Sequence, residues 1–121
     1  MSNAAMQPQD KLPLTPAVFH ILLALADGEK HGYGIMQEVA RITDGTMQMG
    51  PGTLYGTIKR LLEAGLVEES DERPDPALDD ERRRYYHLTA DGERVAQAEA
   101  KRLAHLLNVA ATKRLMGRAS G

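Results

Sequence analysis

Apolar side chains recur at helical spacing in three successive segments of the first half of the chain. In each segment an apolar residue returns every third or fourth position, which places one apolar stripe along a helix. The stripes consist of Val18, Ile21, Leu22 and Leu25, of Ile35, Met36, Val39 and Ile42, and of Leu54, Ile58, Leu61 and Leu62. We therefore expect three amphipathic helices around one core.

Capping residues and glycines predict where these helices begin and end. A Thr-Pro pair offers an N-cap hydroxyl followed by a proline whose missing N–H costs nothing at the first helical position. A glycine just beyond the last apolar position suits the left-handed conformation that closes many helices. The expected helical segments, with their capping residues, are 15–28, 31–45 and 51–65.

After Gly65 the pattern changes to the alternation typical of strands. Segments 66–69 and 84–88 are predicted strands, with Tyr86 and Leu88 on one face, and a turn-rich loop over 71–81 joins them. The second and third helices, joined by a short connection, form a helix-turn-helix, and the two strands form a wing. The predicted fold is mainly α with a small β wing, a winged helix-turn-helix followed by a long C-terminal helix.

The C-terminal segment predicts one long helix from Thr89, its N-cap, to about 116. Its far half has little core left to cover, and each unpartnered leucine would forfeit about 1.5–3 kcal/mol of burial. We expect a second copy of the helix to cover the stripe; the alternative is that the helix folds back on its own domain. The stripe consists of Ala96, Leu103, Leu106, Leu107 and Ala110.

These patterns divide the chain into four parts. Residues 1–13 are expected to form a flexible arm, whose opening 1–4 resembles a cloning remnant. Residues 14–89 form the winged helix-turn-helix, 90–116 the dimerisation helix, and 117–121 a flexible tail.

Composition excludes several classes of protein. The chain has no cysteine, and its net charge is −2, with 15 basic and 17 acidic residues. No apolar run reaches the ~18 residues of a membrane span, so we expect a cytoplasmic protein without membrane contact. Neither His31, His87 and His105 nor the adjacent acids 79–81 have the spacing of a metal or catalytic site. We therefore expect no enzyme activity, no cofactor and no metal.

The glycines near the second and third helices do not indicate a nucleotide site. Dinucleotide and phosphate loops need a preceding strand, and a P-loop also ends in Gly-Lys-Ser/Thr. Neither 31–34 nor 50–56 has these features, so tight helix packing explains the glycines better.

The outer face of the third helix has the chemistry of a DNA major-groove reader. It begins with small residues and hydroxyls and ends in two cations, Lys59 and Arg60. Small residues permit close approach, hydroxyls can bond bases or phosphates, and cations suit phosphate. Charges of each sign are also grouped along the sequence. The acids are concentrated in 68–81, and the three arginines Arg82–Arg84 follow directly.

These residues resemble the PadR-like transcriptional regulators. The matching segments run in order from 14 to 92 and include 31–35, Gly50-Pro51-Gly52-Thr53-Leu54-Tyr55, 61–67 and Arg84-Tyr85-Tyr86-His87-Leu88-Thr89. The single C-terminal helix is similar to the shorter branch of the family. The acidic wing loop departs from the family pattern, and without Trp an aromatic ligand pocket would need Tyr or Phe19.

The resemblance implies a homodimeric DNA-binding protein, usually a repressor of a palindromic operator, released by a small-molecule effector or another signal. By position, it assigns Pro51, Gly52, Thr53 and Tyr55 to the recognition-helix motif, and Arg83 and Arg84 to the base of the wing.

For several of the candidate DNA-binding residues, the sequence allows two different roles. Tyr55 contacts DNA or packs beside Leu54, and Lys59 and Arg60 contact phosphate or form a solvated face. Arg83 and Arg84 reach the DNA backbone or pair with the acids at 79–81. For the whole protein, the alternative is a winged-helix interaction module without specific DNA binding.

Overall fold

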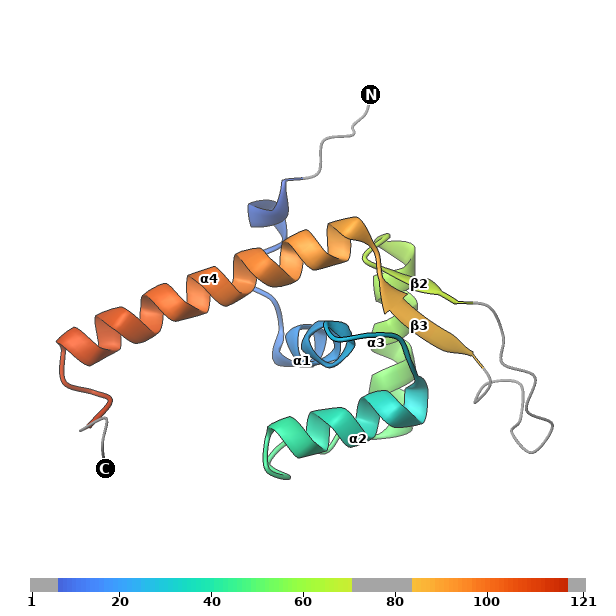
Figure 1. Ribbon diagram of the computed structural model, residues 1–121, viewed down its shortest axis with the longest axis horizontal. Coiled ribbons are helices and arrows are strands. Elements are labelled where there is room, and N and C mark those ends of the chain that lie inside the picture. Colours follow the sequence, from blue (N-terminus) through green and yellow to red (C-terminus); the bar gives the residue numbers. More distant parts are fainter. Residues whose placement is uncertain (1–6, 71–83, 118–121) are drawn as a thin grey trace.

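The computed structural model describes residues 7–70 and 84–117 of the 121-residue chain. These residues form a helical body with a small antiparallel sheet at one side (Figure 1). The elements in chain order are a 3₁₀ helix η1 (Pro8–Lys11), α1 (Pro16–Leu25), β1 (Lys30–His31), α2 (Gly32–Ile42), α3 (Pro51–Glu63), β2 (Val67–Glu69), β3 (Tyr85–Leu88) and α4 (Ala90–Thr112). The predicted winged helix-turn-helix with a long C-terminal helix is confirmed.

The apolar stripes of the first three helices meet in one core. Their central residues are buried, and the edge residues Val18, Met36, Ile42 and Leu62 are partly exposed. Thr15 caps α1 as predicted, because its hydroxyl accepts a hydrogen bond from the Val18 N–H at 3.2 Å. The buried stripe residues are Ile21, Leu22, Leu25, Ile35, Val39, Leu54, Ile58 and Leu61.

The predicted closing residues are correct for α2 and α3, whereas the predicted end of α1 is too late. Gly65 has a φ of +76°, and the Leu66 N–H donates to the Leu61 carbonyl at 3.0 Å, which closes α3. α2 ends at Ile42, and Asp44 and Gly45 after it have φ values of +52° and +79°. The Gly45 N–H donates to the Ala40 carbonyl at 2.7 Å, which closes the helix. α1 ends at Leu25, three residues before Gly28, because a turn separates them.

The wing belongs to a sheet of three strands rather than two. β3 lies in the middle, antiparallel to both β2 and β1, and Tyr86 faces Lys30 on one side and Glu69 on the other. Tyr86 is buried and Leu88 is half-buried against the core, which confirms their common face. The sequence missed β1 because two residues are too few to show alternation.

The start of α4 is fixed against the end of α3. Thr89 caps α4 by accepting from the Gly92 N–H at 3.0 Å, and its hydroxyl donates to the Gly65 carbonyl at 2.7 Å. The Thr89 N–H also donates to the Leu66 carbonyl at 3.1 Å. Gly92 lies so close to this carbonyl that a Cβ would overlap the Leu66 oxygen.

The C-terminal half of α4 extends beyond the rest of the body (Figure 1). The helix ends at Thr112, before the expected end near 116, because Arg114 adopts a φ of +64° and the Leu115 N–H bonds back to the Ala110 carbonyl at 2.9 Å. Within 7–70 and 84–117, no helix is both long and apolar enough to cross a membrane.

Residues 7–14 pack on α4 and the core, whereas the sequence predicts a flexible arm over 1–13, of which 1–6 lie outside the described residues. η1 lies against α4, and Leu12 and Leu14 contact the core. The Leu14 N–H donates to Glu99 Oε2 at 3.0 Å. These contacts come from scattered residues of one short helix and its flank, so no periodic pattern reveals them.

Candidate nucleic-acid interface

The face of α3 predicted to read DNA is exposed. Leu54, Ile58 and Leu61 face the core, which leaves the opposite side of the helix to solvent. The exposed predicted residues on α3 are Pro51, Gly52, Thr53, Lys59 and Arg60. The helix begins after Gly50, whose carbonyl accepts from the Leu54 N–H at 2.9 Å.

Two glycines on α3 have no structural reason to be glycine, so the tight packing expected from the sequence at 50–56 is wrong. A Cβ at Gly52 or Gly56 would meet no other atom within 4 Å, and neither residue has a positive φ. A glycine inside a helix costs about 0.5–1 kcal/mol relative to alanine. These glycines therefore lower stability without helping the packing, and they leave the backbone of α3 open to close approach.

Tyr55 was predicted either to contact DNA or to pack beside Leu54. It is half-buried, and its hydroxyl end lies against Gly32 at the start of α2, where a Cβ would overlap the ring. Gly32 thus makes room for Tyr55, and the tyrosine connects the beginnings of α2 and α3. Packing accounts for the position of its ring, and contact with DNA stays a prediction.

The two cations of α3 differ in how they are held. Arg60 Nη2 donates to the hydroxyl of the buried Thr57 at 3.2 Å, which fixes the guanidinium beside the helix. Lys59 is exposed and forms no ion pair with another described residue. Its ammonium group is therefore available to a phosphate.

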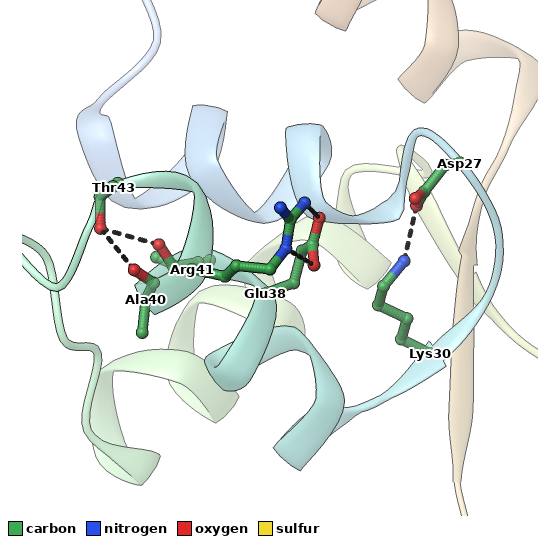
Figure 2. A network of polar contacts seen from close by, with 7 residues as sticks. Asp27, Lys30, Glu38, Ala40, Arg41 and Thr43 are labelled. Atoms are coloured by element: carbon green, nitrogen blue, oxygen red, sulfur yellow. Dashed lines mark hydrogen bonds and ion pairs between the residues drawn. The ribbon is translucent and has the colours of Figure 1, made fainter.

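The cations in and before α2 are paired, as Figure 2 shows. Lys30 Nζ lies 2.6 Å from Asp27 Oδ1, and Arg41 Nη2 lies 2.7 Å from Glu38 Oε2. Hydrogen bonds from Lys30 and Arg41 lower the pKa values of Asp27 and Glu38, respectively. These pairs neutralise the charge along α2, which concentrates unpaired positive charge on α3.

At the base of the wing, a histidine joins the two strands in a way the sequence did not predict. His87 Nδ1 lies 2.7 Å from the Ser70 hydroxyl, and His87 Nε2 lies 3.2 Å from Glu68 Oε1. The Ser70 N–H also donates to the Tyr85 carbonyl at 2.7 Å. Only the pairing register brings these residues together, so spacing along the chain gives no sign of them.

The predicted wing cations are only partly described. Arg84 is exposed just before β3. Arg83 and the acidic loop over 71–81 lie outside the described residues.

The predicted dimerisation stripe of α4 changes character along the helix. Ala96 packs against the core, and Leu103 and Ala110 are partly exposed. Leu106 and Leu107 are 47% and 55% exposed in the single chain. The face that is covered by the core near Ala96 thus continues into solvent.

Comparison with known proteins shows to which family the chain belongs. The model of the transcriptional regulator PadR-like family matches residues 21–98. The chain belongs to the PadR-like family of transcriptional regulators. Membership supports the prediction of a regulator rather than an enzyme.

Two relatives differ in how much of their length this PadR-like chain spans. It is 40% identical over 83 residues to the transcriptional regulator Rv3488 of Mycobacterium tuberculosis, covering 69% of this chain and 70% of the relative. It is 35% identical over 86 residues to an uncharacterized 37.1 kDa protein in transposon TN4556 of Streptomyces fradiae. That match covers 71% of this chain but only 22% of the relative.

Solved structures share the fold at low identity. A PadR family transcription regulator from Clostridium difficile R20291 has a TM-score of 0.65 and 19% identity, covering 81% of this chain and 97% of that one. Bacillus subtilis PadR, solved in complex with operator DNA, has a TM-score of 0.59 and 22% identity. The latter match covers 75% of this chain and 48% of that one.

Proposed function

We propose that this PadR-like regulator is a homodimeric repressor that binds a palindromic operator in double-stranded DNA. The observation that carries the proposal is the exposed face of α3, where Gly52 and Gly56 leave the backbone open and Lys59 follows unpaired. In this proposal Gly52 and Thr53 approach base edges and nearby phosphates, and Pro51 sets the entry of the helix.

The cations supply the sequence-independent part of binding. Lys59 and Arg60 lie further along the same face as Gly52, and Arg84 lies at the base of the wing. We assign phosphate contacts to these three and, by position in the sequence, to Arg83. That Bacillus subtilis PadR was solved with operator DNA supports a DNA ligand for this fold.

Dimerisation would follow from the exposed part of the α4 stripe. A second α4 covering Leu106 and Leu107 would remove two large apolar side chains per chain from water. Two-fold symmetry in the protein would be mirrored in the operator, with half-sites about one or two helical turns apart, ~34 Å per turn.

A signal would release the repressor by changing the separation of the two α3 helices. A small-molecule effector can do so only to the extent that it binds one separation more tightly than the other. As a regulator bound to DNA, the protein would act in the cytoplasm.

The salt dependence of DNA binding separates this function from its alternative, a winged-helix interaction module without specific DNA binding. The net charge of −2 is the observation that favours the alternative. We would measure fluorescence anisotropy of a labelled duplex titrated with the protein over a salt series. Counterion release predicts affinity that falls steeply with salt, whereas absent or trace binding at low salt would contradict the repressor proposal.

A further inference from the structure

Thr57 places a buried hydroxyl in the apolar stripe of α3. It is 1% exposed, and among the described residues only Glu99 is another buried polar side chain. Thr57 lies three residues after Leu54 and four before Leu61, so it faces the core with them. Valine has nearly the same shape and would bury no polar group, so packing with the core does not account for the threonine.

The buried hydroxyl accepts a hydrogen bond from Arg60, about one turn further along α3. Arg60 Nη2 lies 3.2 Å from Thr57 Oγ1. Packing around Thr57 holds this oxygen in place, so the guanidinium is bonded to a fixed point. Arg60 itself is exposed and forms no ion pair within the described part of the chain. The guanidinium is therefore restrained in position while its positive charge stays unneutralised.

Arginines on α2 and α4 are held in a way that cancels their charge. Arg41, Arg94 and Arg102 each pair with a carboxylate three residues earlier on the same helix. Arg60 has the same spacing to its partner, but the partner is a hydroxyl. A carboxylate at position 57 would neutralise the arginine and repel a nearby phosphate, whereas a hydroxyl holds the guanidinium without doing either.

A restrained arginine binds an anion more tightly than a free one. Ordering a long side chain on binding weakens association by about two- to tenfold, and a side chain that is already in place avoids that loss. A guanidinium has several N–H donors, and Thr57 accepts from one of its nitrogens. The remaining donors can make the paired hydrogen bonds that a guanidinium forms with phosphate oxygens.

We propose that Thr57 is a positioning residue for DNA binding, which holds the Arg60 guanidinium where its remaining N–H groups contact one phosphate of the DNA backbone. Thr57 does not touch DNA, because it is buried, and it acts only through Arg60. The inference rests on the proposed function of α3. It adds a difference between the two cations of that helix, because Arg60 is placed before DNA arrives, whereas the exposed Lys59 contributes charge alone.

The test measures affinity for a fluorescein-labelled duplex of mixed sequence, since phosphate contacts do not depend on sequence. Thr57→Val should weaken binding about two- to tenfold, and Thr57→Ser, which keeps the hydroxyl, should bind like the parent chain. Thr57→Val should leave the salt slope unchanged because no charge is removed, whereas Arg60→Gln should lower it by about one. Thermal unfolding of each variant checks that a loss of binding is not a loss of the fold.

Two further backgrounds separate positioning from a general effect on α3. In chains that carry Arg60→Gln, Thr57→Val should have no further effect, because no guanidinium is left to position. Lys59→Gln is the matched control background, in which Thr57→Val should weaken binding by the same factor as in the parent chain. An equal factor in both backgrounds would overturn the inference, and so would a parent-like affinity of Thr57→Val.

A measurement without DNA distinguishes failure of this inference from failure of the proposed function. NMR relaxation of the Arg60 Nε–H group in the free chain should show a restrained side chain in the parent and in Thr57→Ser, and a mobile one in Thr57→Val. Equal mobility in all three would overturn the positioning role, whatever the chain binds. A parent chain that binds no duplex would sink the proposed function and this inference together, whereas binding without coupling between Thr57 and Arg60 would overturn this inference alone.

Discussion

Gly92 is the residue at which the fold leaves no room for a side chain. A Cβ here would overlap the Leu66 carbonyl, which is backbone and already bonded to the Thr89 N–H. We expect Gly92→Ala to lower the free energy of unfolding by about 1–3 kcal/mol, the usual cost of overpacking. Urea denaturation followed by circular dichroism measures the change.

Gly56→Ala is the matched control for that substitution. Gly56 is also a helical glycine, but a Cβ there meets nothing within 4 Å. The variant should be about 0.5–1 kcal/mol more stable than the parent chain, because alanine loses less backbone entropy. Equal effects at the two positions would show that Gly92 does not lie against Leu66.

Glu99 should make the free energy of unfolding depend on pH. Hydrogen bonding from Arg102 and the Leu14 N–H lowers the pKa of its carboxyl below the ordinary 4.5. Because the folded-state pKa is the lower one, the stabilisation is complete above the unfolded pKa and is lost as pH falls through the folded pKa. We expect Glu99→Gln to lose about 1–3 kcal/mol at neutral pH and to approach the parent chain in acid.

Thermal unfolding between neutral pH and pH ~3 measures this difference. Glu63→Gln, at an exposed position on α3, should stay within about 0.5 kcal/mol of the parent chain throughout. A gap between Glu99→Gln and the parent that stays constant down to the lowest pH would contradict the assigned ion pair.

Removing the charge of Lys59 tests one of the proposed phosphate contacts. If its unpaired ammonium contacts a phosphate, Lys59→Gln should weaken binding to all duplexes alike and lower the salt slope by about one. Duplex titrations over a salt series give the slope. An unchanged slope would remove Lys59 from the interface.

The residues that the sequence could not assign are those whose partners are distant in the chain. Glu99 lies in a charge-rich helix, a setting in which a glutamate is usually exposed. It is nevertheless buried, because the Leu14 N–H and Arg102 donate hydrogen bonds to its carboxylate oxygens. The close approach at Gly92 likewise depends on tertiary packing with Leu66. By contrast, the exposure of Gly52, Lys59 and Arg60 was predicted correctly, because exposure on a helix follows from the stripe on its other side.

At the scale of elements, long periodic segments were predictable and short ones were not. The stripes of α1, α2 and α3 repeat over several turns, and the caps at Thr15, Gly65 and Thr89 have side chains or conformations that only a few residues provide. β1 was missed because it has two residues. The end of α4 was missed because Arg114, not glycine, takes the left-handed position.

The exposed end of α4 makes a prediction about assembly. We expect the parent chain to sediment as a dimer and Leu106→Asp combined with Leu107→Asp to sediment as a monomer, because charge cannot be buried between two apolar stripes. Analytical ultracentrifugation at micromolar concentration distinguishes the two. Asn108→Asp, on the exposed opposite side of the helix, should remain dimeric.

A parent chain that sediments as a monomer would contradict the dimer outright. Dimers that persist in the Leu106 and Leu107 variant would contradict the assigned stripe and point to another contact surface.

For the whole molecule, the fold and the family follow from the sequence, whereas assembly and regulation depend on a second copy and a ligand. One chain presents one α3, one wing and one projecting end of α4 (Figure 1). Neither the spacing of two recognition helices nor the response to an effector is encoded in a local pattern. These properties are therefore proposals that rest on exposed surfaces.

Selection of bound duplexes from a random library by the purified chain tests the central claim most directly. The account predicts enrichment of an inverted repeat whose half-sites lie about one or two helical turns apart, ~34 Å per turn, bound with steep salt dependence. Failure to enrich any sequence, or enrichment of a single half-site without symmetry, would contradict a dimeric reader of a palindromic operator.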